Sequence, residues 1–140
     1  MLVQVDISYL TIIIAAVVSF IIGAFWYSPL LFGNSWMKLT GLSKIDVEKT
    51  KKGKMTKLYL AEFLAQLIMA YVLAHFVIYA DAFTIIDGLQ VGFWIWLGFA
   101  ATISLGIILW ENKSIKLYLI NAGYWLVVLL IQGIILSVGQ

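Results

Sequence analysis

The strongest constraint on this chain is that it carries four long apolar runs. They cover about residues 9–27, 58–79, 85–110 and 117–138. A run of about 18 or more apolar residues is long enough to cross the hydrocarbon layer of a bilayer as an α-helix. Because lipid offers the backbone no hydrogen bonds, each run must satisfy its own amides, which a helix does. We therefore expect four transmembrane helices.

Composition excludes an ordinary water-soluble domain. The chain has 140 residues, of which 64% are hydrophobic and 11% charged, whereas soluble domains average about 25% charged residues. A chain this short cannot bury so much apolar surface in one core, so the surplus must face lipid or protein. We interpret residues 1–140 as a single all-α integral membrane domain. Cysteine is absent, which excludes disulfides and thiolate metal sites.

The lysines predict the orientation of the helices. All nine basic residues are lysines, and they lie in the connection at about residues 28–57 and in the turn between the third and fourth spans. Since cytoplasmic loops are enriched in lysine and arginine, we expect a multi-pass protein of the plasma (inner) membrane with both termini extracytoplasmic. No lysine precedes Lys38, so the first span is expected to be retained and not cleaved as a signal peptide.

Capping residues and a repeated motif predict two helical hairpins. Thr84 and Asp87 have capping-box spacing at the start of the third span, and Ser114 can cap the fourth. The turn between these spans is short enough to force an antiparallel hairpin. The motif KLYL opens the second and fourth spans, at Lys57–Leu60 and Lys116–Leu119, as a tandem, parallel duplication of a two-helix hairpin would require.

The stretch FWYSPLLFG, residues 25–33, ends the first span. Proline lacks an amide proton and disfavours helical geometry at the residue before it, whose serine hydroxyl can bond a freed carbonyl. We interpret the stretch as a helix break with an interfacial aromatic anchor. The alternative is a broken helix whose freed backbone groups bind a solute, as in some transporters. The residues concerned are Trp26, Tyr27, Ser28, Pro29, Gly33 and Trp36.

The rest of this connection is polar and basic. Ser43 and Asp46 could cap a short interfacial or cytoplasmic helix that runs through Lys52 and ends at Gly53. The lysines here could contact anionic lipid headgroups, or they could serve only to set topology. Nucleic-acid binding is not expected, because arginine is absent and the patch lies against a membrane. The candidate lipid contacts are Lys49, Lys51, Lys52, Lys54 and Lys57.

Glu62 is the main candidate for a functional residue. An ionisable group within a membrane span is costly and marks a functional site by default. Gln66 lies one turn further on the same helix face, and Asn121 and Glu111 lie near the same side of the membrane on other spans. These four residues could form an intramembrane polar cluster. The cluster could only fix helix packing, Glu62 could snorkel toward nearby lysines, or Glu62 could bind a proton or cation.

Small residues at four-residue spacing predict close helix contacts. Four helices have few mutual faces, so a stripe left unused inside the bundle predicts a homo-oligomer, most simply a two-fold dimer. The stripes are Ala15, Ser19 and Gly23; Ala61 and Ala65; Gly98, Thr102 and Gly106; and Gly133 and Ser137.

No constellation of catalytic residues is found in the sequence. No serine or lysine has a base partner at a motif spacing, and there is no glycine-rich phosphate loop. The single histidine, His75, cannot build a metal site within one chain. We therefore expect no enzymatic activity, no cofactor and no bound metal.

Several motifs resemble a known family. The segments IGAFWYSPLLFGNSWMKLTGL and WLGFAATISLGIILWENKSIKLYLINAGYWLVVLLIQGIIL resemble the small bacterial membrane proteins catalogued as domain of unknown function 1761. The most specific parts are WYSPLLFG, W-x-x-L-x-G and INAGYWL, and the resemblance covers nearly the whole chain. It implies a four-span membrane protein and supplies no activity.

Two functions remain open from the sequence. The first is a homo-oligomeric membrane scaffold, or a module that interacts with lipid or a partner protein, which the low polar content and the basic connection favour. The alternative is a small oligomeric transporter or channel for a proton, ion or small solute. That alternative depends on Glu62 and its polar neighbours.

Overall fold

The computed structural model describes residues 4–42, 44–50 and 52–140, and this part of the chain is helical with no strand. Four stretches of helix are long and apolar enough to cross a membrane, which are the four spans that the sequence predicts. The elements are α1 (Tyr9–Trp26), α2 (Gly33–Thr40), α3 (Lys44–Glu48), α4 (Lys52–Tyr79), α5 (Ile85–Ile95), the π-helical segment η1 (Trp96–Ala101), α6 (Thr102–Trp110) and α7 (Ile115–Val138).

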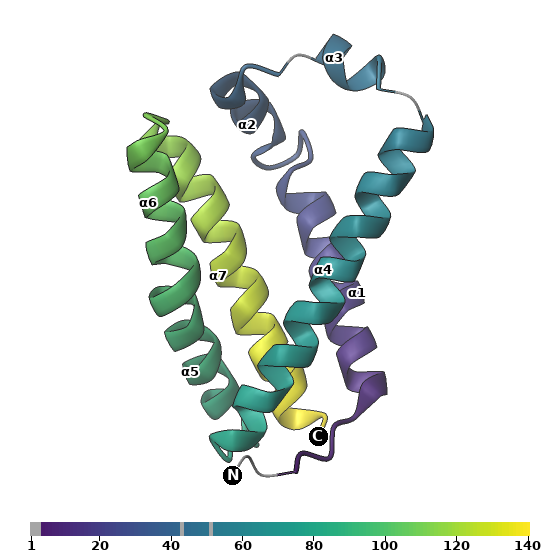
Figure 1. The fold of residues 1–140 in the computed structure, drawn as a ribbon, viewed down its shortest axis with the longest axis vertical. Coiled ribbons are helices and arrows are strands. Elements are labelled where there is room, and N and C mark those ends of the chain that lie inside the picture. The colour runs from purple at the N-terminus through teal and green to yellow at the C-terminus, as the bar shows by residue number, and fades with distance from the viewer. Residues whose placement is uncertain (1–3, 43, 51) are drawn as a thin grey trace.

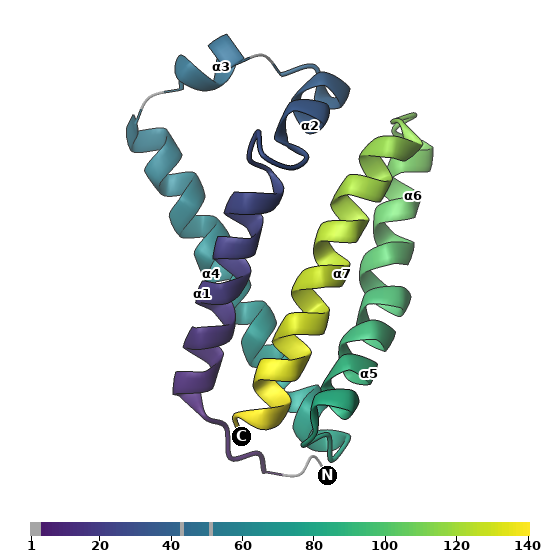
Figure 2. The same ribbon diagram turned by 180° about the vertical axis from the view of Figure 1, so that it is seen from behind.

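The long helices stand side by side, and α5, η1 and α6 form one continuous rod (Figure 1). Both lysine-bearing connections lie at one end of the molecule, which we call the lysine end. Both termini and the α4–α5 connection lie at the opposite, terminal end (Figures 1 and 2). Toward the lysine end α4 leans away from α7, so these two helices form a V (Figure 1).

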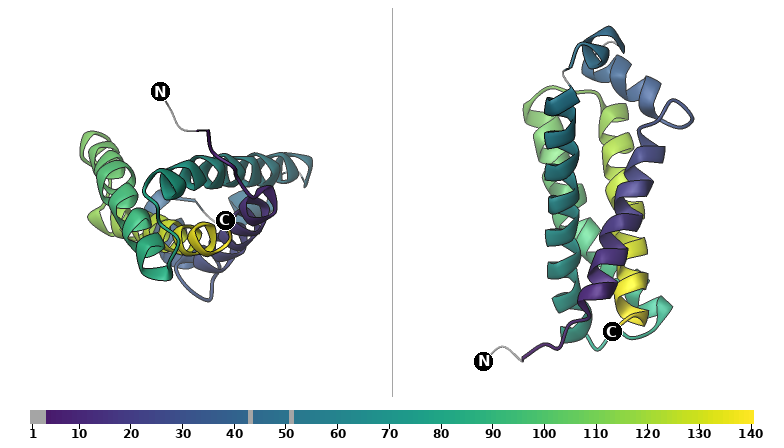
Figure 3. Two further views of the ribbon diagram at one scale, coloured as in Figure 1. Left: turned by 90° about the horizontal axis from the view of Figure 1, so that it is seen from below. Right: turned by 90° about the vertical axis from the view of Figure 1, so that its right-hand side faces the viewer.

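α7 is the central helix of the bundle. It contacts α1, α4 and the α5–η1–α6 rod, and a view along the bundle shows it between them (Figure 3). Its buried side chains are accordingly spread along the whole helix, from Leu117 to Ser137. The outer faces of the other spans remain apolar and exposed, with Trp94 at 64% and Leu109 at 66%. Such surfaces suit lipid, so the four apolar helices indicate a multi-pass membrane protein.

The predicted caps are present in the structure. Thr84 Oγ1 accepts from the Asp87 amide at 3.2 Å, and the Asp87 carboxylate accepts from the Thr84 amide at 3.1 Å. Ser114 Oγ accepts from the Lys116 amide at 3.2 Å. Each cap satisfies an amide that the first helical turn leaves free.

The lysine-rich connection differs from the prediction. The short helix ends at Glu48, and α4 already begins at Lys52 and continues through Gly53 without a break. The prediction of one helix running through Lys52 and ending at Gly53 was therefore wrong. Glycine inside a helix costs only about 1 kcal/mol, which the long apolar span after it can offset. The expected cap, Ser43, lies outside the described residues.

The end of α1 is a tight turn around Pro29. Ser28 Oγ donates to the Phe25 carbonyl at 2.6 Å, as its position before proline predicts. The amide of Gly33 donates to the Ser28 carbonyl at 2.9 Å. A Cβ at Gly33 would lie 2.7 Å from that carbonyl oxygen, so only glycine fits where α2 begins. The chain therefore breaks and turns back at the lysine end.

The closest contact between helices is made by α5 and α7. A Cβ added at Gly88 would lie 2.7 Å from the Gly133 carbonyl carbon and from Ser137 Oγ, and one at Gly92 would lie 2.9 Å from the Leu129 carbonyl carbon. The predicted stripe on the fourth span is thus used inside the bundle. Its partner stripe, however, is the Gly88–Gly92 pair, which the sequence analysis missed.

The stripe predicted on the third span faces outward. A Cβ at Gly98 or Gly106 would meet no other atom, and Thr102 is exposed. Ala61 and Ala65 on α4 are exposed as well. The helix contacts of α4 are made instead by other residues, among them Ala70, Leu73, Ala74 and Val77 in the hydrophobic core.

The π-helical segment keeps one rod facing α7 along its length. Gly92 and Ala101 are both buried, yet in an ideal α-helix they would be about two and a half turns apart and on opposite faces. The wider π turn, which holds more residues than an α turn, reduces this difference. Tyr118 of α7 donates to the Ala101 carbonyl at 3.1 Å, and Thr102 donates to the Gly98 carbonyl at 2.7 Å.

Candidate functional site

Polar side chains meet where α1, α4 and α7 come together. Ser19 of α1, Gln66 of α4 and Gln132 of α7 each have 0% exposure. Gln132 Nε2 donates to Ser19 Oγ at 2.8 Å and to Gln66 Oε1 at 3.4 Å. Ser19 Oγ in turn donates to the Ala15 carbonyl at 2.8 Å. These bonds join three spans about halfway along the bundle.

Glu62 extends these hydrogen bonds toward the lysine end. Gln66 Nε2 donates to Glu62 Oε1 at 3.0 Å and to the Tyr124 hydroxyl at 3.1 Å. Gln66 and Tyr124 are buried, whereas Glu62 is exposed, since α4 leans away from α7 at this level (Figure 1). We call Ser19, Glu62, Gln66, Tyr124 and Gln132 the polar network. Its one carboxylate lies at its open end.

Tyr124 occupies a niche that Gly23 of α1 provides. A Cβ at Gly23 would lie 2.9 Å from the Tyr124 hydroxyl oxygen. The Tyr124 ring also packs edge-on against Tyr27, with ring centroids 5.2 Å apart. The small residue therefore lets α7 bring a phenol to Gln66 across the face of α1.

Asn121 lies beside the polar network and bonds a different partner. Its Oδ1 accepts from the Tyr27 hydroxyl at 2.8 Å. Trp26 Nε1 donates to the Ile120 carbonyl at 3.0 Å. The aromatic residues at the end of α1 therefore direct their polar atoms onto α7, and Asn121 is linked to Tyr124 through the Tyr27 ring.

Other predicted site residues lie apart from this network. Trp36 packs edge-on against Tyr27, with ring centroids 5.8 Å apart. Glu111 is exposed at the end of α6, and within the described chain no hydrogen bond joins it to the network. Lys49, Lys54 and Lys57 are exposed.

For two of the predicted lipid contacts the structure does not describe the side chain. Lys51 lies outside the described residues, and only the backbone of Lys52 is described.

The polar network is closed on its terminal side. Core residues lie beyond it on each helix: Ile12 on α1, Leu73 on α4 and Leu136 on α7. Leu136 is 0% exposed and the other two are nearly so. In the described chain the buried Oε1 of Gln132 has no hydrogen-bond partner. The network therefore reaches from an exposed carboxylate to a buried acceptor and stops at an apolar seal.

Ser19, Tyr124 and Gln132 were not predicted from the sequence as site residues. Tyr124 and Gln132 are just over two turns apart on α7 and so share one face, which is a signal the sequence does contain. Ser19 was considered only as a small residue for packing. In the described residues no group of three or more histidine, aspartate or glutamate side chains could hold a metal ion.

Comparison with known proteins identifies a family. The model of a family described as "Protein of unknown function (DUF1761)" matches residues 10–137. No curated protein and no solved structure matches the chain.

Proposed function

The chain belongs to the DUF1761 family, whose motifs it was expected to share, and we propose that it binds a proton or small cation at Glu62 and carries it across the membrane. The observation that carries this proposal is the chain of hydrogen bonds from the exposed Glu62 through the buried Gln66 to Gln132 and Ser19. Asp87 caps α5, so within the described residues Glu62 alone supplies a carboxylate within a long helix and away from its ends.

The shape of the site supports a carrier. The network is exposed at the lysine end and sealed by core residues at the terminal end. A carrier that alternates between two sides needs a site open to one side at a time. The positive-inside rule predicts that the lysine end lies in the cytoplasm, so the polar network would open to the cytoplasm.

The carboxylate of Glu62 determines the charge of the ligand. A carboxylate held within a membrane span is costly as an unpaired charge, so it takes up a proton or pairs with a cation. Gln66 donates to it at 3.0 Å, and the amide can reorient as the charge on the carboxylate changes. Exchange of one positive species for another at Glu62 then accompanies movement of α4 against α7.

Proteoliposomes test the proposal. Purified protein is reconstituted, a membrane potential is imposed, and proton, Na⁺ and K⁺ fluxes are followed. We expect flux above that of empty liposomes in the wild type, loss of it in Glu62→Gln, and its retention in Glu111→Gln, which removes the exposed carboxylate at the end of α6. Equal flux in the wild type and in Glu62→Gln would contradict the proposal, as would no flux of any of these ions.

A second candidate is a self-associating scaffold, which the outward-facing stripe favours. Gly98, Thr102 and Gly106 are unused within the bundle, and small residues allow close approach of membrane helices. We propose a dimer through this face, which is compatible with either function. The exposed Lys49 and Lys57 would contact anionic headgroups at the lysine end.

Disulfide formation tests the dimer, because the chain contains no native cysteine. Thr102→Cys is expected to cross-link in membranes under mild oxidation. Leu60→Cys, on the exposed face of α4 at 64% exposure, is the matched control and is expected to stay monomeric. Equal cross-linking of the two variants would contradict the dimer.

A further inference from the structure

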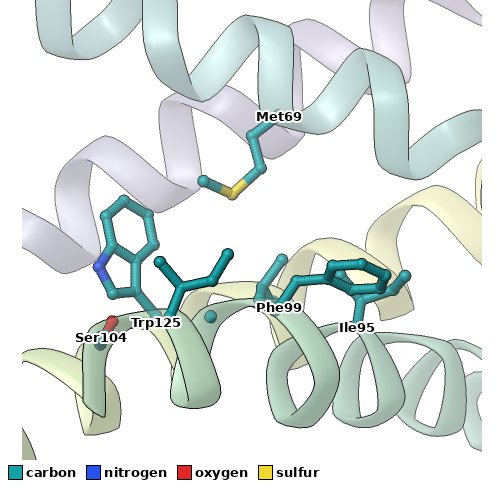
Figure 4. A pocket seen from close by; sticks show the side chains of 8 residues that line it. Met69, Ile95, Phe99, Ser104 and Trp125 are labelled. Carbon is teal, nitrogen blue, oxygen red and sulfur yellow. The ribbon is translucent and has the colours of Figure 1, made fainter. Parts of the chain in front are cut away.

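An apolar cavity of about 300 Å³ lies between α4, α7 and the π-helical segment (Figure 4). Met69 extends from α4 toward the Trp125 indole of α7, and Phe99 lies on the opposite wall (Figure 4). Ala100 and Ser104 also line it. Its volume is at the lower end of the roughly 300–1,000 Å³ that is typical of ligand pockets.

Met69, which lines the cavity, lies on the same face of α4 as Glu62. Met69 follows Glu62 by nearly two helical turns, which places it about 10 Å farther along the axis in almost the same direction. Gln66 lies between them. On α7, Tyr124 of the polar network and Trp125 of the cavity are neighbours whose ring centroids are 4.8 Å apart. Contacts from Glu62 through Gln66 and Tyr124 to Trp125 therefore connect the anionic end of the network with the wall of the cavity.

The wall of the cavity is formed partly by the π-helical turn. Phe99 and Ala100 belong to η1, and π-helical turns are frequent at functional sites. The Trp125 indole and the Ser104 hydroxyl are the polar groups of an otherwise hydrocarbon wall. An aromatic face attracts a cation, whereas the apolar wall excludes a fully hydrated ion.

We propose that the ligand of this site is an amphipathic organic cation. Its ammonium group pairs with Glu62 beside the Tyr124 and Trp125 rings, and its hydrocarbon part fills the cavity between Met69 and Phe99. This inference rests on the proposed function and narrows its substrate class. The organic cation exchanges at Glu62 with the proton or small cation of the proposed function, and its hydrocarbon part is what the apolar cavity accommodates.

Four probe molecules separate the charged part of the site from the apolar part. Octyltrimethylammonium carries both the cation and the chain, tetramethylammonium carries only the cation, octanol only the chain, and octanesulfonate the opposite charge. Radiolabelled octyltrimethylammonium is bound to detergent-solubilised protein by equilibrium dialysis, and the other three compete with it. Protein-free micelles correct for partitioning into detergent.

We expect the wild type to bind octyltrimethylammonium at least tenfold more tightly than each of the other three probes. In Glu62→Gln, octyltrimethylammonium should bind no more tightly than octanol. In Ala100→Leu, which fills the cavity, it should bind no more tightly than tetramethylammonium. Ser104→Leu is a second cavity-filling variant with the same expected result. Glu111→Gln and Gly53→Ala should bind as the wild type does, since neither position lines the cavity.

Binding that is unchanged in both Glu62→Gln and the cavity-filling variants would overturn the inference. So would equal affinity for octyltrimethylammonium and octanesulfonate. If these results occur while Glu62-dependent ion flux persists in liposomes, the substrate class is wrong and the proposed function stands. If Glu62-dependent flux is also absent, both proposals are contradicted.

Discussion

At the scale of single residues, the interior of this protein is organised by a few polar atoms and the small residues that make room for them. Gln66 accepts from Gln132 of α7, and it donates to Tyr124 of the same helix and to Glu62 of its own helix. Gly23 provides the space in which the Tyr124 hydroxyl reaches Gln66. Interhelical bonds of this kind average about 0.6 kcal/mol in membranes. The network therefore fixes the relative positions of the helices more than it stabilises the fold.

The niche at Gly23 gives a prediction. Gly23→Ala places a methyl group 2.9 Å from the Tyr124 hydroxyl and should displace it from Gln66. We expect a loss of about 1 kcal/mol of stability and reduced flux, measured by thermal unfolding in detergent and in liposomes. Gly53→Ala is the control, because a Cβ there meets open space, and it should unfold at or above the wild-type temperature. Equal effects of the two substitutions on the unfolding temperature and on flux would contradict the claim that Gly23 makes room for the Tyr124 hydroxyl.

The bond between Gln66 and Gln132 can be measured with a double-mutant cycle. Gln66→Leu, Gln132→Leu and the double variant should show a coupling energy of about 0.6 kcal/mol, because the two amides bond directly at 3.4 Å. A cycle of Gln66→Leu with Thr102→Val should show none, since Thr102 bonds its own helix. Coupling of equal size in both cycles would mean that the network does not act through this contact.

At the scale of helices, the sequence predicts which segments are helical better than it predicts which faces touch. Length and hydropathy locate the four spans, and the caps at Thr84 and Ser114 follow from local chemistry. The runs are apolar on every side, so periodicity does not mark the buried face. For this reason the outward Gly98 stripe was noted and the inward Gly88–Gly92 pair was not. The π turn depends on tertiary contacts with α7 and has no sequence signal.

The α5–α7 contact predicts a large effect of one methyl group. Gly88→Ala drives a Cβ toward the Gly133 backbone and Ser137 Oγ, and backbone yields less easily than a side chain. We expect a loss of about 1–3 kcal/mol, seen as a lower unfolding temperature and less monodisperse protein. Gly53→Ala, in open space near the start of α4, should behave as the wild type. A neutral Gly88→Ala would show that the two helices are not in close contact.

At the scale of the whole molecule, the segregation of lysine and the placement of the connections agree. Both lysine-bearing connections are at one end and both termini at the other (Figure 1), as the charge pattern predicts. The polar cluster was foreseen only in part. Glu62 and Gln66 are bonded, whereas Glu111 lies outside the cluster and three members were missed. Which polar residues meet depends on the tilt of α4 against α7, and no pattern in either helix encodes that tilt.

The orientation of the molecule can be checked with single cysteines, because the native chain has none. Gln4→Cys, near the N-terminus, should react with a membrane-impermeant maleimide in intact cells. Glu48→Cys, at the end of α3, should react only after the membrane is permeabilised, since the lysine end is expected in the cytoplasm. The reverse pattern would invert the topology and with it the side to which the site opens.

The most direct test of a site open to the lysine end is the accessibility of Glu62 itself. Glu62→Cys should react rapidly with an impermeant thiol reagent in inside-out vesicles and slowly in right-side-out vesicles. Leu136→Cys, in the seal at 0% exposure, and Leu109→Cys, on the outer face at 66% exposure, should react in neither. Rapid reaction of Glu62→Cys from the outer side, or no more reaction than Leu109→Cys, would contradict a water-accessible carboxylate facing the cytoplasm.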